Sequence, residues 1–226
     1  MLDFGFYCMD CMEGMKEFPD KFFDLAIPDP QYGNKIGIDG KVGIDGKVGI
    51  DKCAPCKQYK PIKWNFKPPN KDYFKQLIRI SKNQIIWGIN YFTNIWKFDS
   101  GRIVWDKDNS GNFSDCELAF QSFSKGIKKF KWRWNGMLQQ NMKQKEIRIH
   151  PTQKPVALYR WLLQNYAKPG MKLIDTHVGS GSSLIAFEWE GFYDYVGFEI
   201  DEDYYRDATK RLEQWRKSRT MDIFKK

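Results

Sequence analysis

Apolar and polar positions follow two alternating spacings along most of this chain. Short apolar runs bounded by proline, glycine or polar residues predict strands over 24–27, 84–88, 102–105, 117–120, 171–174 and 193–198. Apolar residues at helical spacing predict helices over 72–81, 155–166, 182–190 and 201–219. Strands that alternate with helices imply an α/β fold with a mostly parallel sheet that is covered on both faces.

Two segments interrupt this alternation. Residues 37–52 repeat the motif Gly-Ile-Asp-Gly-Lys-Val, and two and a half copies are too few for a solenoid. We therefore expect a flexible glycine-rich loop over 34–60. Residues 125–149 are basic and aromatic and have no clear period. The remainder is consistent with one domain over 1–226 that carries these two segments.

Charge is concentrated in the second of these segments. The chain has a formal net charge of +9, and residues 125–149 hold eight basic residues against one acid, Glu146. Phe130, Trp132 and Trp134 alternate with basic residues, as on a strand with one aromatic face. This pattern predicts phosphate contact and base stacking by a DNA-binding set: Lys128, Lys129, Lys131, Arg133 and Trp134. The alternative is a solvated basic loop above a small aromatic cluster.

Neither membrane insertion nor export is indicated. No apolar run reaches the ~20 residues that cross a bilayer, and the first residues do not resemble a signal peptide. We therefore expect a cytoplasmic protein. The five cysteines include two CxxC pairs, at Cys8/Cys11 and Cys53/Cys56, which could in principle form a zinc site. Their wide separation is unlike that of zinc ribbons, so we expect no metal.

A glycine turn follows the predicted strand at 171–174. Gly179-Ser180-Gly181 leads into a helix that begins at Ser182, an arrangement that lets a ligand approach the backbone and the free helical N–H groups. The next strand ends at Glu199, where a carboxylate can accept hydrogen bonds from ribose hydroxyls. Leu184 stands where a dinucleotide-binding motif has its third glycine, which disfavours a nicotinamide or flavin cofactor.

An acidic turn, Asp29-Pro30-Gln31-Tyr32, follows the predicted strand at 24–27. The exocyclic amino group of a base is a poor nucleophile because its lone pair is delocalised into the ring. The Asp29 carboxylate and the Pro30 carbonyl could accept its two protons, and Tyr32 could stack on an extruded base. The alternative is a proline-rich turn in which the aspartate is only a cap.

These two motifs, together with His150-Pro151-Thr152-Gln153-Lys154-Pro155, resemble the beta class of DNA amino-methyltransferases. In that class the catalytic motif comes first, a target-recognition region follows, and the cofactor motifs come last. The resemblance implies a circularly permuted, Rossmann-like S-adenosylmethionine-dependent methyltransferase fold. It also implies S-adenosyl-L-methionine as cofactor, double-stranded DNA as substrate, a cognate restriction endonuclease, and pairing of two copies.

The resemblance assigns roles by position. Asp29, Pro30 and Tyr32 would hold the target base, with Asp29 also at the cofactor. The cofactor-binding set comprises Asp10, Cys11, Thr152, Lys154, Asp175, His177, Gly179, Ser180, Gly181, Ser182, Glu199 and Ile200.

Two positions depart from the family pattern. Gln31 replaces the usual second proline, and His177 replaces the usual aromatic residue. For His177, a cap on the cofactor and a plain packing role both stay open. Aspartate rather than serine at position 29 favours adenine N6 over cytosine N4 as the methylated atom. A catalytically impaired DNA-binding relative is the alternative outside catalysis.

Overall fold

The computed structural model describes residues 1–33, 67–109, 114–135 and 138–223. The predicted loop over 34–60, with its repeat and the Cys53/Cys56 pair, lies outside the described residues.

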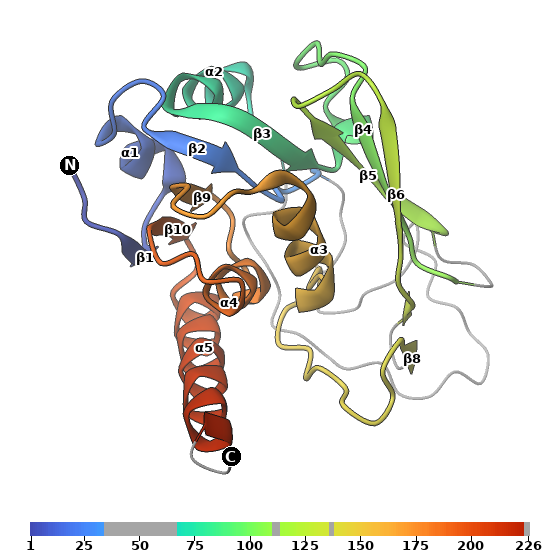
Figure 1. Ribbon diagram of the computed structural model, residues 1–226. Helices are drawn as coiled ribbons and strands as arrows, with labels where there is room; N and C mark the ends of the chain where they lie inside the picture. Colours follow the sequence, from blue (N-terminus) through green and yellow to red (C-terminus); the bar gives the residue numbers. More distant parts are fainter. Residues whose placement is uncertain (34–66, 110–113, 136–137, 224–226) are drawn as a thin grey trace.

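One eight-stranded sheet forms the centre of the molecule, in the spatial order β1-β10-β9-β2-β3-β5-β4-β6 (Figure 1). The first five strands in this spatial order, β1, β10, β9, β2 and β3, are mutually parallel. Strand β5 is antiparallel to both its neighbours, β3 and β4, and β6 runs parallel to β4. The strands are β1 (Gly5–Cys8), β2 (Phe23–Ala26), β3 (Ser81–Trp87), β4 (Arg102–Asp106), β5 (Cys116–Gln121), β6 (Ile127–Lys131), β9 (Leu173–Asp175) and β10 (Tyr195–Glu199). A separate hairpin is formed by β7 (Trp134–Asn135) and β8 (Leu138–Gln139).

Strands from the two ends of the chain meet in the middle of this sheet. β2 pairs with β9, with Leu25 opposite Leu173 and Ala26 opposite Ile174. Because both strands run the same way, the residues that follow each of them emerge at the same edge. In open α/β sheets this edge, next to a change in strand order, is where ligands bind.

Helices cover both faces of the sheet (Figure 1). On one face, α1 (Cys11–Lys16), α2 (Lys71–Ile80) and the short 3₁₀ helix η1 (Ile89–Tyr91) share an apolar core that includes Phe74 and Phe198. On the other face, α3 (Val156–Tyr166), α4 (Ser182–Trp189) and α5 (Glu202–Ile223) share a second core that includes Leu162 and Phe187. Residues 182–188 of α4 are all buried, since this helix lies between the sheet and the helices beside it.

The predicted fold class is confirmed: the chain folds as a Rossmann-like α/β sheet covered by helices. Each predicted strand and helix is present with its ends shifted by a few residues. β1 and α1 were not predicted, because each is short and β1 has no fully buried residue. No helix in the described part of the chain is long and apolar enough to cross a membrane.

Candidate functional site

Four neighbouring strand ends bring the predicted acidic residues to one edge of the sheet. Cys8 at the end of β1 lies opposite Glu199 at the end of β10, and Gly197 of β10 lies opposite Asp175 at the end of β9. Asp29 follows the next strand, β2. The edge therefore carries acids from both ends of the chain, as the sequence predicted.

The glycine loop between β9 and α4 has the backbone that its sequence demands. Gly179 and Gly181 have φ angles of +54° and +77°, a region that other residues avoid. A Cβ on Gly179 would lie 3.5 Å from the imidazole ring of His150, and one on Gly181 would lie 3.4 Å from Ala208 of α5. Ser180 and Ser182 are buried in the same loop, 3.1 Å apart at their hydroxyls. The two Cβ distances are ordinary van der Waals contacts, so the positive φ angles rather than crowding require glycine at both positions.

Asp175 is held by hydrogen-bond donors from the loop that follows it. The Ser183 hydroxyl donates to one carboxylate oxygen at 2.5 Å, and the backbone N–H of His177 donates to the other at 2.9 Å. Burial raises the pKa of Asp175 to about 7, and the nearby negative charges of Asp29 and Glu199 add to the shift.

His177 lies against α2. Its ring packs edge-on against Tyr73, with centroids 5.3 Å apart, and its Nδ1 is 2.9 Å from the Thr176 hydroxyl. Burial lowers the pKa of His177 to about 4, so the ring is neutral at pH 7. A neutral, partly buried ring supports the packing role and leaves the cofactor role a proposal.

Glu199 closes the other side of the loop. Its carboxylate accepts hydrogen bonds from the backbone N–H groups of Gly179 at 2.8 Å and Asp201 at 2.9 Å.

The remaining predicted cofactor residues lie at the start of α1 and after β10. Asp10 caps α1 by accepting a hydrogen bond from the N–H of Met12, and burial raises the pKa of the neighbouring Cys11 thiol to about 12. Ile200 is exposed at 56%. We call Asp10, Asp175, Glu199 and the glycine loop the cofactor-side cluster.

The cofactor-side cluster fits S-adenosylmethionine chemically. A carboxylate has about four lone-pair positions, so Glu199 can still accept from ribose hydroxyls while it holds its two N–H donors. The negative charges of Asp29 and Glu199 also act on Asp175. A cationic sulfonium would relieve that repulsion.

A second group of charged residues surrounds Asp29. Lys154 lies 2.5 Å from one Asp29 oxygen, and the Tyr32 hydroxyl donates to the other at 2.6 Å. The side chains of Lys154 and Asp29 are only 3% and 11% exposed. Burial raises the pKa of Asp29, although the positive charge of Lys154 opposes this shift. For Lys154, burial alone would lower the pKa, but the negative charges of Asp29 and Glu117 outweigh burial and raise it. Lys154 thus contacts the predicted catalytic acid directly.

Glu117 of β5 joins this group although the sequence did not single it out. It lies 3.0 Å from Lys154 and 2.5 Å from Lys107, and these two cations lower its pKa to about 2 although burial alone would raise it. The signal available was an acid within a predicted apolar strand, which is costly unless it is paired. We call Asp29, Tyr32, Lys154, Glu117 and Lys107 the catalytic cluster.

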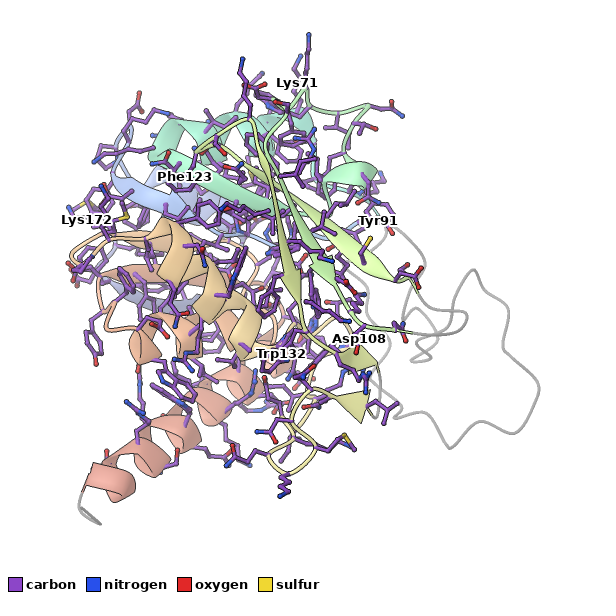
Figure 2. All side chains as sticks on the ribbon, turned by 45° about the vertical axis from the view of Figure 1, so that its right-hand side comes forward. Lys71, Tyr91, Asp108, Phe123, Trp132 and Lys172 are labelled. Carbon is purple, nitrogen blue, oxygen red and sulfur yellow. The ribbon has the colours of Figure 1, made fainter. Side chains whose placement is uncertain are left out.

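Aromatic rings form one wall of the catalytic cluster. Tyr32 stacks on Tyr91 with centroids 4.6 Å apart and planes 11° apart. A Cβ on Gly88 would come within 2.0 Å of the Tyr32 ring, so this position accepts only glycine, in keeping with its φ of +72°. Tyr91 is 45% exposed, at the end of η1 (Figure 2). No local sequence pattern selects Tyr91, because it reaches Tyr32 only in the folded chain.

The segment before α3 connects the two clusters. His150 packs on Tyr204 of α5 with ring centroids 4.3 Å apart, next to Gly179. Thr152 is exposed, and its hydroxyl is 3.1 Å from Nδ1 of His150. The same segment continues to Lys154 in the catalytic cluster. His150 therefore touches the glycine loop, whereas Thr152 adjoins it only through His150.

The basic segment has a different structure from the one predicted for its aromatic residues. Trp134 is 7% exposed and donates its indole N–H to the Gln153 carbonyl, so it cannot stack on DNA in this conformation. Phe130 is buried as well, and it packs between Trp132 and Trp161 of α3. The aromatic side chains are thus part of the core, and Trp134 is removed from the DNA-binding set.

The basic side chains of β6 remain at the surface. Lys128, Lys129, Lys131 and Arg133 are exposed. Lys131 and Arg133 lie 2.7 and 2.5 Å from Asp108, which is labelled in Figure 2, and Lys129 lies 3.5 Å from Asp106. Exposed pairs of this kind hold their partners weakly, so these cations stay available to a polyanion.

Comparisons of sequence identify the family. The model of the DNA methylase family matches residues 48–210. M.HinfI, a type II methyltransferase of Haemophilus influenzae, is 24% identical over 91% of this chain and 67% of its own length. YubD of Escherichia coli (strain K12) is 37% identical over 65 residues, which make up 29% of this chain and 28% of YubD.

Solved structures share the fold at lower identity. The M1.HpyAVI–SAM complex has a TM-score of 0.53 at 19% identity, covering 93% of this chain and all of the other. The cytosine-N4-specific PvuII DNA methyltransferase has a TM-score of 0.56 at 13% identity, covering 96% and 91%. With a family match over most of its length and this arrangement of strand ends, the chain belongs to the DNA methylase family of S-adenosylmethionine-dependent amino-methyltransferases, which act on adenine N6 or cytosine N4.

Proposed function

We propose that this chain methylates the N6 amino group of adenine in double-stranded DNA. One observation carries the proposal: the buried Asp29 carboxylate is held between Tyr32 and Lys154 at the strand end next to Asp175. An acceptor so fixed can hold an amino proton of the base without rearranging during the reaction. Aspartate at this position, where N4-cytosine enzymes favour serine, supports adenine.

S-adenosylmethionine, when bound, supplies a methyl group that its sulfonium has already activated. The protein then contributes position and electrostatics. Asp29 and the Pro30 carbonyl would orient the lone pair of the amino nitrogen, and Tyr32 would support the face of the extruded base. The cofactor-side cluster would hold the ribose through Glu199 and the methionine part near Asp175.

Exposed cations of β6 support DNA as the substrate from the other side of the site. Lys128, Lys129, Lys131 and Arg133 would contact phosphates, which positions the duplex without reading its sequence. We propose residues 125–149 as the recognition segment. Gln139 is an unsuitable base reader, because it is buried and its amide bonds the backbone of Glu146.

The decisive experiment is nucleoside mass spectrometry of duplex DNA incubated with the protein and S-adenosylmethionine. N6-methyladenine is the expected product, and Asp29→Asn is the matched control. N4-methylcytosine alone would overturn the choice of base while leaving the family reaction intact. Cofactor binding without transfer to any DNA would instead identify an impaired relative, with Gln31 as the first residue to revert to proline.

A further inference from the structure

A half-buried ion pair joins the recognition segment to the glycine loop. Glu146 lies 2.6 Å from Arg211 of α5, and the two side chains are 23% and 14% exposed. Arg211 also donates to the Ser180 carbonyl at 2.8 Å and to the Ser182 hydroxyl at 2.9 Å. One guanidinium therefore bridges an acid of the recognition segment and the loop of the cofactor-side cluster.

Glu146 is itself fixed by three further contacts. Its second carboxylate oxygen accepts from the N–H of Val156 at 3.0 Å, which caps α3 directly after the Lys154–Pro155 segment. Its backbone N–H and carbonyl each bond the side-chain amide of Gln139 at 2.8 Å. Glu146 thus contacts the recognition segment, the start of α3 and, through Arg211, the glycine loop.

We propose that the Glu146–Arg211 pair is a positioning element that couples cofactor binding to DNA binding. This inference rests on the proposed function, because it takes the glycine loop as the cofactor site and 125–149 as the recognition segment. A ligand that orders the loop through Ser180 also fixes Arg211. Since Arg211 holds Glu146, a shift of the loop on ligand binding is passed to the recognition segment. Linkage requires the reverse effect to be equally large.

An ordinary structural role would not explain this arrangement fully. Arg216, five residues along the same helix, pairs with the buried Glu188 of α4, which also accepts from Tyr195. That pair joins elements of the sheet and its helices without touching the glycine loop or the recognition segment. Arg216→Gln is therefore a matched control, since it also leaves a buried glutamate without its arginine.

The test measures the Kd of S-adenosylhomocysteine, a non-reactive probe, with and without a duplex that the wild-type chain methylates. The ratio of the two values is the coupling factor. We expect roughly a fivefold factor or more for the wild type, in the range usual for coupled sites. Glu146→Gln and Arg211→Gln should bring the factor close to one, while Arg216→Gln should keep it.

If the pair has a structural role alone, the variants should bind S-adenosylhomocysteine more weakly both with and without the duplex, and the coupling factor should be unchanged. That result would overturn the inference. If the single variants fail to fold, the double variant Glu146→Gln/Arg211→Gln leaves neither charge alone and should fold without coupling. Independent binding of cofactor and DNA by the wild type would refute the coupling and leave the proposed function standing. Absence of cofactor binding by the wild type would refute both.

Discussion

The two clusters at the sheet edge stabilise their buried carboxylates in opposite ways. On the cofactor side, among the described residues, Asp175 and Glu199 accept hydrogen bonds from backbone N–H groups and a serine hydroxyl. On the catalytic side, Asp29 and Glu117 are paired with lysines. Burial raises the pKa of Asp175 to about 7, whereas the lysines lower that of Glu117 to about 2. The pKa of Asp29 stays raised, because burial outweighs the effect of Lys154.

The difference matches the ligands that each cluster is proposed to hold. Dipoles from N–H and O–H groups stabilise a carboxylate without cancelling its charge, so the cofactor side stays acidic and suits a sulfonium cation. In the catalytic cluster two acids and two lysines offset one another, which suits an uncharged base. Carboxylates thus suit a cationic ligand in one cluster and an uncharged base in the other, because their hydrogen-bond and charge partners differ.

The largest expected effect comes from removing the central cation. Lys154→Met should lower the free energy of unfolding by roughly 3–5 kcal/mol, because Asp29 would lose its lysine and face the negative charge of Glu117. Urea denaturation followed by circular dichroism measures this loss. Lys128→Met, at the exposed surface of β6, is the control and should change stability by no more than ~0.5 kcal/mol. A similar small change for Lys154→Met would mean that the pairing in the catalytic cluster contributes little.

Removing the charge of Asp29 tests the other half of the same pair. Asp29→Asn should reduce single-turnover methyl transfer by roughly 10²–10³-fold, the usual cost of losing one oriented partner of the reacting group. Cofactor affinity should stay nearly unchanged, since the cofactor-side cluster is intact. Asp106→Asn is the control, because it removes the charge of a surface acid that pairs with Lys129 and leaves an oxygen to accept the N–H of Asp108. Full activity in Asp29→Asn would remove the aspartate from the mechanism.

The stacked tyrosines offer a smaller effect on the catalytic side. With ring centroids 4.6 Å apart, Tyr32 and Tyr91 leave no space for a base between them, so an extruded base must part the rings. Tyr91 would then form the outer wall, and Tyr91→Ala should cost roughly 1–3 kcal/mol in kcat/KM for DNA. Tyr91→Phe keeps the ring and should resemble the wild type. An alanine variant that binds DNA more tightly would show that Tyr91 only competes with the base.

The smallest effect concerns pH and the cofactor side. Because the folded pKa of Asp175 is raised to about 7, its protonated form stabilises the fold at low pH, and this contribution is lost as pH rises through 7. Asp175→Asn has no carboxyl group to titrate at this position. The Tm of the variant relative to that of the wild type should therefore rise as the pH is increased from 5 to 8. A gain of a few degrees is expected, since 1 kcal/mol shifts the Tm of a domain of this size by about 2–4 °C. A Tm difference that does not change with pH would contradict the shift.

The sequence by itself determined most of the elements, their order and the two turns that we propose bind ligands. Apolar spacing is a local property, so strands such as β2 and helices such as α2 follow from a few neighbouring residues. The glycines at 179 and 181 and the acid at 29 were also readable, because backbone conformation and proton acceptance each require particular residue types. The family resemblance then gave the order in which these motifs come together.

Only the tertiary structure decided which charges and rings meet. Lys154 and Asp29 are separated by 125 positions, and their pairing depends on the segment before α3 lying beside the turn that follows β2. Glu117 joins the catalytic cluster from β5, and Tyr91 of η1 stacks on its Tyr32. Trp134 points inward, where its indole N–H donates to the Gln153 carbonyl. Burial and the distance between partners decide which side chains interact, and neither quantity can be predicted from the spacing of residues along the chain.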